Sequence, residues 1–195
     1  MKTLKKEIKL QGKKYKSDFI FFEKNDKKKL RKFFEDWESL CKRSFRIGGT
    51  RKINLPESFS EAVFCLEMNV ARSVKNISGI SSSFDCYDFK REKRIQIKAS
   101  SSKGPTQFGP STIQDETYFI YFRKLAESKP PVTNYSGEFE IYKLNQKKIE
   151  KVMVNKNETL KDQKDQIRRP RFVVDSKLIK PLNLQPTKKG DVKAW

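Results

Sequence analysis

Apolar side chains recur at helical spacing from residue 30 onwards, with Lys and Glu between them. The apolar positions are Leu30, Phe33, Phe34, Trp37, Leu40 and Cys41. Asn25 or Asp26 can accept backbone N–H groups at the start of this stretch, as an N-cap does. The pattern predicts an amphipathic helix with one face on the core. Residues 1–24 are basic and end in an apolar run, which we interpret as a strand or an arm.

A second apolar stripe follows a connector, residues 46–58, that contains two glycines and a proline. Its members are Phe59, Val63, Leu66, Val70 and Val74. The helix is expected to begin near Ser58 or Ser60, because Ser58 and Glu61 have the spacing of a capping box. The stripe favours a second helix packed on the core.

Short apolar runs separated by polar turns occupy the middle of the chain. Residues 84–88 and 94–99 form two of them, with charged residues between. Residues 116–125 are almost continuously apolar, which is typical of a strand buried on both faces, and residues 137–144 alternate. A helix is expected near residues 157–167. Helices before and after a central group of strands predict an α/β fold, with a central mixed β-sheet flanked by helices.

The length of 195 residues fits one domain with a sizeable core. Within it we expect an N-terminal arm or strand at residues 1–24 and a core at residues 25–125. Strands and a basic segment are expected at residues 126–195. The sequence contains no signal peptide, lipidation motif or apolar run long enough to span a membrane. We therefore expect a soluble cytoplasmic protein that does not bind a membrane.

The net charge of the chain indicates the kind of molecule that it binds. Lys and Arg number 44 against 24 Asp and Glu, which gives a net charge of +20. So much like charge disfavours a compact fold unless it serves to bind a polyanion, and nucleic acid is the leading candidate. A solvated surface on a lysine-rich chain is the alternative explanation.

The residue types that are missing exclude several kinds of chemistry. The chain has no histidine, so nuclease mechanisms that use histidine as base or nucleophile are closed to it. Its three cysteines are scattered, which suggests neither a disulfide framework nor a zinc site. A phosphodiester bond would have to be cut with carboxylates, amides, lysine and a hard cation.

Such a set falls within residues 84–99. If this stretch folds as an antiparallel hairpin centred on Arg91 and Glu92, Asp85 lies opposite Lys98, and Tyr87 lies opposite Gln96. Alternation then divides the hairpin into two faces. The polar face contains Asp85, Tyr87, Gln96 and Lys98, and the apolar face contains Phe84, Cys86, Ile95, Ile97 and Ala99. Asp88 points away from the polar face in this register and ranks below Asp85, although a bulge would reverse that order.

The polar face offers what metal-assisted hydrolysis requires. Asp85, the amide oxygen of Gln96 and the carbonyl that follows it are oxygen ligands of the kind that Mg²⁺ prefers, and Mn²⁺ is expected to be able to replace it. Lys98 can orient the attacking water and stabilise charge on the phosphate. The alternative is a hairpin whose polar face only contacts water.

Asp85 followed by Gln96-Ile97-Lys98 resembles the PD-(D/E)xK nuclease core, which type II restriction endonucleases commonly use. Flanking segments resemble that group in the same order, from about Ile53 to Val174. The similar segments are INLPESFSEAVFCL, SSFDCYDFKREKRIQIKAS, GPTQFGPSTIQDETYFIYF and DQIRRPRFVV. The resemblance implies a restriction-endonuclease-like core, Mg²⁺-dependent cleavage of double-stranded DNA at a short specific sequence, 5′-phosphate ends and a homodimer.

The chain departs from the motif at two positions. Phe84 stands where the motif has proline, and Gln96 stands where it has an acid. An amide carries one less negative charge, so the metal should be held more weakly. Relatives in which a preceding helix adds a glutamate suggest that Glu61 completes the metal site, against its interpretation as a capping residue. Glu57 is a weaker candidate.

DNA contacts are expected from three polar or basic segments, each of which could instead be a solvated loop. The loop after Lys98 can bring hydroxyls and N–H groups close to phosphates. Arginines near residue 170 have the planar fork that reads guanine. The candidates are Arg51, Lys52, Ser100, Lys103, Thr106, Gln107, Arg168, Arg169 and Arg171.

The leading hypothesis is a type II restriction endonuclease. A structure-specific or repair nuclease on the same core, which would ignore sequence, is an enzymatic alternative. A basic nucleic-acid-binding module with an inert hairpin is the non-enzymatic alternative, and binding without hydrolysis in Mg²⁺ or Mn²⁺ would distinguish it.

Overall fold

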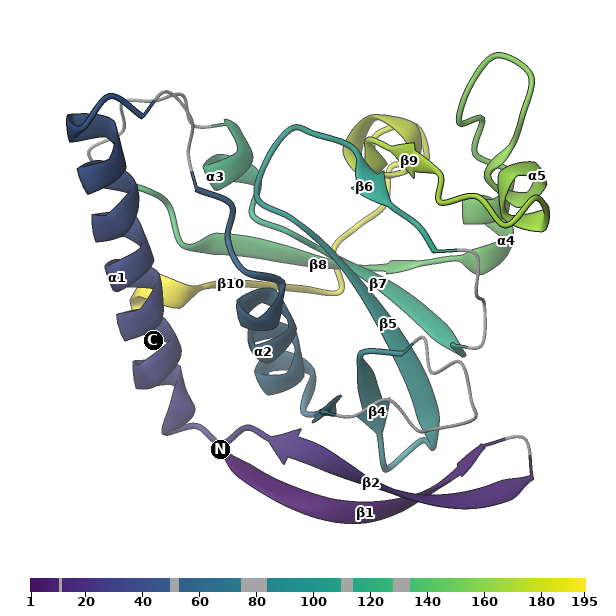
Figure 1. The fold of residues 1–195 in the computed structure, drawn as a ribbon, viewed down its shortest axis with the longest axis horizontal. Helices are drawn as coiled ribbons and strands as arrows, with labels where there is room; N and C mark the ends of the chain where they lie inside the picture. Colours follow the sequence, from purple (N-terminus) through teal and green to yellow (C-terminus); the bar gives the residue numbers. More distant parts are fainter. Residues whose placement is uncertain (11, 50–52, 75–83, 110–113, 128–133) are drawn as a thin grey trace.

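The computed structural model describes residues 1–10, 12–49, 53–74, 84–109, 114–127 and 134–195. Most of its strands join one large curled sheet (Figure 1). In spatial order these are β1 (Lys2–Leu10), β2 (Lys13–Phe21), β3 (Ala71–Ser73), β4 (Cys86–Asp88), β5 (Lys93–Ser100), β7 (Glu116–Tyr121), β8 (Glu138–Leu144) and β10 (Lys188–Asp191). Within this sheet β5 and β7 are parallel and the other neighbours are antiparallel, so the sheet is mixed.

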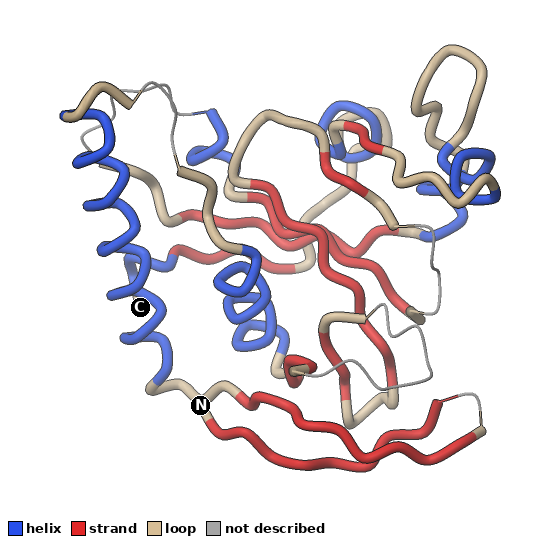
Figure 2. Tube along the Cα trace, viewed as in Figure 1, coloured by secondary structure: helices blue, strands red, loops and turns tan. Residues whose placement is uncertain are grey.

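Helices pack against both faces of this sheet (Figure 2). The helical elements are α1 (Asp26–Arg46), α2 (Glu57–Met68), α3 (Arg123–Glu127), α4 (Gln146–Glu150), α5 (Leu160–Asp165), the π-helical turn η1 (Asp175–Ile179) and the 3₁₀ turn η2 (Val192–Ala194). A separate two-stranded ribbon contains β6 (Thr106–Gln107) and β9 (Arg171–Phe172). The predicted α/β fold with a central mixed sheet flanked by helices is therefore confirmed.

Strand β7 shows why both faces are covered. Its alternate side chains Tyr118 and Ile120 belong to a core cluster shared with α1 and α2. The neighbouring Phe119 and Tyr121 belong to a second cluster shared with α4, α5 and η1. Each side chain named is buried, so the strand contributes to two hydrophobic layers, as its continuous apolar sequence predicts.

The predicted helices differ from the observed ones mainly at their ends. Asn25 precedes α1 but its side chain makes no cap hydrogen bond, and the Asp26 carboxylate instead accepts the N–H of Glu23. Helix α2 begins at Glu57, one residue before the expected start near Ser58, but it lacks a side-chain cap, so the expected capping box is wrong. It ends at Met68, and the next residue, Asn69, has a left-handed φ of 54°, so the last valines of the apolar stripe lie outside the helix.

The pairing of β4 with β5 is shifted by two residues from the predicted register, so each residue of β4 lies opposite a residue two positions earlier in β5. Cys86 pairs with Ile95 and Asp88 pairs with Lys93. The cause is Asp88, whose Oδ1 accepts the backbone N–H groups of Lys90 and Arg91 and thereby closes the turn. A shift of two residues keeps every side chain on its face.

Two aromatic residues of this hairpin do not lie where the sequence pattern puts them. Tyr87 is 3% exposed and packs with Phe19 and Phe84 in a third cluster, so it is not part of an open polar face. Phe84 belongs to the same cluster and is not packed with Cys86, contrary to expectation. The β1–β2 hairpin supplies the apolar partners for both rings, which confines the polar opening to the region of Asp85 and β5.

Candidate active site

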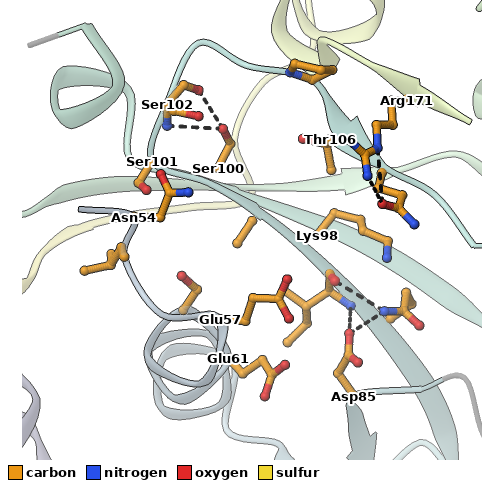
Figure 3. Close-up of a pocket in the computed structure, with 17 residues that line it drawn as sticks. Asn54, Glu57, Glu61, Asp85, Lys98, Ser100, Ser101, Ser102, Thr106 and Arg171 are labelled. Atoms are coloured by element: carbon orange, nitrogen blue, oxygen red, sulfur yellow. Dashed lines mark hydrogen bonds between the residues drawn. The ribbon is translucent and has the colours of Figure 1, made fainter. Parts of the chain in front are cut away.

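A cavity of about 500 Å³ opens between the start of α2, strand β5 and the β6–β9 ribbon (Figure 3). Asp85, Gln96 and Lys98 all line it. Gln96 and Lys98 lie two residues apart on β5 and therefore project from the same face of the strand. Asp85 precedes β4 and is held against this strand by its backbone N–H, which donates to the carbonyl of Ile95 over 2.9 Å.

The carboxylate of Asp85 is bound by two groups from β5. Its Oδ2 accepts the backbone N–H of Ile97 at 2.7 Å and Nε2 of Gln96 at 2.5 Å. Nε2 of Gln96 also donates to the carbonyl of Ile97 at 3.3 Å. Asp85 therefore lies beside Gln96 rather than beside Lys98, as the shifted register requires.

Burial controls the charge of Asp85. Loss of water around the carboxyl group raises its pKa to about 6, despite the opposing hydrogen bond from Ile97. The nearby carboxylates of Glu61 and Glu57 raise this pKa further, and Lys98 lowers it. Because water solvates its ionised form poorly, the carboxylate would be stabilised by a bound cation.

Among the described residues that line the cavity, Lys98 is the one lysine. Burial lowers the pKa of its ammonium group, against the attraction of Asp85 and Glu57. Its Nζ lies 5.9 Å from the centre of the Phe108 ring, and no described carboxylate forms a salt bridge with it. The geometry leaves this cation available for an anionic group within the cavity.

Two glutamates approach the cavity from α2, on the side opposite β5 (Figure 3). Glu57 and Glu61 are one helical turn apart and both line the cavity. Glu61 is bound by Arg72, whose Nε lies 2.5 Å from its Oε2. Glu61 therefore takes no part in a capping box, and its carboxylate charge is already partly neutralised.

The donor set fits a hard cation. The carboxylate of Asp85 and the carbonyl of Ile97 are oxygen ligands that both accept Nε2 of Gln96, and a half turn of this amide would bring its oxygen to the same place. Among the described residues, no three His, Cys, Asp or Glu side chains are clustered tightly enough to form a metal site by themselves. Oxygen ligands of this kind are those that Mg²⁺ takes, and Mg²⁺ usually keeps several water ligands besides the few that the protein supplies.

The predicted DNA contacts fall into three groups. Ser100, Thr106, Gln107 and Arg171 line the cavity. Lys103 is exposed on the intervening loop but lies outside the cavity lining, as does Arg169. Arg168 is also outside it and forms a salt bridge with Glu158 at 3.4 Å. Arg51 and Lys52 lie outside the described residues.

Four polar residues of the cavity were not predicted from the sequence, namely Asn54, Ser60, Ser101 and Ser102. Asn54 and Ser60 flank Glu57 in sequence, so the weak signal at Glu57 pointed to the right segment. Ser102 is engaged locally, since its carbonyl accepts the Ser100 hydroxyl at 2.6 Å. Asp88 does not line the cavity, because its carboxylate closes the hairpin turn and binds Arg91.

Comparison with known proteins gives a consistent result. A family model described as Bsp6I restriction endonuclease matches residues 22–181. A protein described as type II restriction enzyme Bsp6I, from Bacillus sp. (strain RFL6), is 28% identical over 183 residues, which cover 90% of this chain and 94% of that protein. No solved structure matches. None of the helices in the described ranges is long and apolar enough to cross a membrane.

Proposed function

Because the chain belongs to the Bsp6I restriction endonuclease family, we propose that it hydrolyses duplex DNA in the cavity that Asp85, Gln96 and Lys98 line. Membership of this family makes the protein a type II restriction endonuclease, a site-specific enzyme that acts on DNA. The observation that carries the assignment of the site is the convergence of these three side chains on one cavity. We interpret them as a PD-(D/E)xK motif in which glutamine replaces the second acid.

Asp85 is the principal ligand for a Mg²⁺ ion in this proposal, with Mn²⁺ as a possible replacement. The carbonyl of Ile97 and the side chain of Gln96 are the next ligands, and Glu61 completes the site if it is released from Arg72. Gln96 now directs its nitrogen towards Asp85, so it contributes oxygen only after a half turn of its amide. When bound, the cation supplies positive charge that acidifies a water molecule and neutralises the phosphate.

In this proposal Lys98 positions the attacking water and stabilises negative charge on the phosphate. Its buried ammonium group can hold the attacking water by a hydrogen bond and meet the negative charge that grows on the phosphate oxygens. Because burial lowers its pKa, Lys98 is more easily present as the neutral amine, and this amine can accept the proton of the attacking water. Asp85 keeps its own position through the backbone N–H of Ile97.

DNA is held around the cavity by two further groups of residues. Ser100, Thr106, Gln107 and Arg171 line the cavity and are proposed to contact DNA next to the cut bond. Contacts to phosphates are also assigned to Lys103, Arg168 and Arg169, which lie outside the cavity lining, and to Arg51 and Lys52. The net charge of +20 supports such an extended basic surface.

Residues 1–195 act as one endonuclease domain that leaves 5′-phosphate ends. A palindromic site presents the same sequence on both strands, so two copies related by a two-fold axis would place one Asp85 centre at each cut. We therefore propose a homodimer.

Digestion of a plasmid by the purified protein tests this function. We expect discrete, reproducible fragments in the presence of Mg²⁺ and none with EDTA, because the cavity holds too little positive charge to activate water without a cation. Sequencing the fragment ends gives the site and the end chemistry. Random nicking would indicate a structure-specific or unspecific nuclease, and binding without any cleavage in Mg²⁺ or Mn²⁺ would leave only a DNA-binding module. Either result would refute the proposal.

A further inference from the structure

The β6–β9 ribbon forms one wall of the cavity and has two different faces. Phe108 and Phe172 stack in parallel on its inner face, with ring centres 4.7 Å apart, and both are buried. The ribbon is further tied by the N–H of Phe108, which donates to the carbonyl of Pro170 at 2.9 Å. Gln107 and Arg171 pair across the strands and project from the opposite face, towards the cavity.

These two polar side chains form a hydrogen-bonded pair. Both Nε and Nη2 of Arg171 donate to Oε1 of Gln107, at 3.2 and 2.8 Å. The pair is fixed at its base by the ribbon, yet Arg171 is exposed. In the described part of the chain no carboxylate forms a salt bridge with it, whereas Arg94 and Arg123 are bound by carboxylates. The pair is thus an oriented group of donors without a protein acceptor for its outer edge.

The hydrogen-bonding groups on the outer edge of the Gln107–Arg171 pair indicate which base it can bind. The outer side of the guanidinium, made of Nη1 and Nη2, and the Nε2 of Gln107 can only donate hydrogen bonds. Gln107 cannot read adenine in the usual bidentate way, because its oxygen is already bound by Arg171. In the major groove, guanine alone offers two acceptors side by side, O6 and N7.

We propose that the Gln107–Arg171 pair determines sequence specificity by reading the O6 and N7 acceptors of one guanine in the major groove. This inference rests on the proposed function, since it requires DNA in the same cavity. It assigns direct base reading to Arg171 and leaves Arg168 and Arg169 with phosphate contacts. Phe108 follows Gln107 in the chain, and its ring centre lies 5.9 Å from Nζ of Lys98, so the base-reading pair lies close to the proposed catalytic lysine.

Two substitutions test the base contact. Arg171→Ala is expected to lower kcat/KM on the cognate site by roughly 5- to 140-fold, the factor that one bidentate base contact supplies. The variant's preference for guanine over the other bases should fall by the same factor at one position of the site, while the preferences at other positions remain. Arg171→Lys keeps the charge but not the planar fork, and it should lose the same preference. Arg31→Ala, which removes an arginine from α1 that is bound to Glu35, is the matched control and should keep all preferences.

Modified DNA gives a second, independent readout. A duplex with 7-deazaguanine lacks the N7 acceptor at one position, and it should be cut more slowly by the wild type. The variant Arg171→Ala should show no further loss on that duplex, because the contact is already gone. Arg171 is exposed, so thermal unfolding should show a folded variant.

The outcomes separate this inference from the proposed function. If the wild type yields no discrete fragments, the proposed function fails. If it cuts specifically and Arg171→Ala loses affinity equally on every sequence, Arg171 contacts a phosphate and only the present inference is refuted. Wild-type preferences in Arg171→Lys would also refute it, since a point charge would then suffice.

Discussion

Replacing Lys98 with alanine is expected to lower the rate of DNA cleavage by about 10²- to 10³-fold or more while DNA binding is nearly retained. Removing one group that stabilises transition-state charge has an effect of this order. Binding changes little because Lys98 is one cation among many in a chain with 44 Lys and Arg residues. Single-turnover cleavage of a duplex with one site gives the rate, and a gel shift without Mg²⁺ gives the affinity.

A matched control separates the role of Lys98 from loss of charge alone. Lys32→Ala removes an exposed lysine of α1 that is bound to Asp36, outside the cavity lining. This variant should cut like the wild type. If Lys98→Ala cut within tenfold of the wild type, or if both variants lost activity together, Lys98 would not be the catalytic lysine.

Asp85→Asn is expected to reduce cleavage by at least about 10²-fold, because the carboxylate is the principal metal ligand in the proposal. The substitution keeps the shape of the side chain and an oxygen that can accept the N–H of Ile97. Mg²⁺ should raise the melting temperature of the wild type, since it binds the folded state, and should not raise that of the variant. Cleavage by Asp85→Asn at the wild-type rate would contradict the assignment.

The same variant should be more stable than the wild type at neutral pH without Mg²⁺. Burial raises the pKa of Asp85 from 3.8 to about 6, so the folded state holds its proton more tightly than the unfolded state. The cost of ionising this group therefore develops between about pH 4 and 6 and is fully present above it. It corresponds to at most about 3 kcal/mol. Urea unfolding of both proteins at pH 4 and pH 7.5 should show the difference only at the higher pH.

Alternation along the hairpin was sufficient to predict that Asp85, Gln96 and Lys98 lie together, as they do in the lining of one cavity. Gln96 and Lys98 share a face because they lie two residues apart on one strand, and Asp85 stays on that face because the register shift of two residues preserves parity. Periodicity could not fix the register itself, because Asp88 closes the turn through hydrogen bonds to N–H groups nearby in sequence. It also could not place Tyr87, whose burial depends on the distant β1–β2 hairpin.

Contacts between distant segments explain what the sequence did not predict. Arg171 and Gln107 are brought together by pairing of β6 with β9 across the fold, which no local pattern encodes. Glu61 has the spacing of a cap but is bound by Arg72 of β3, and the helix begins at Glu57. Asn54 lies in a segment with no regular structure, and its position in the cavity depends on how α2 packs.

Crystals of the protein with its DNA site and Mn²⁺ would show whether Asp85 holds the metal at the cut bond, because Mn²⁺ can be located by its anomalous scattering. We expect a Mn²⁺ peak within about 2.5 Å of a carboxylate oxygen of Asp85, near the carbonyl of Ile97 and a phosphate of the DNA. A Mn²⁺ peak in contact with DNA but away from Asp85 would contradict it, as would DNA bound on a surface that leaves this cavity open to solvent.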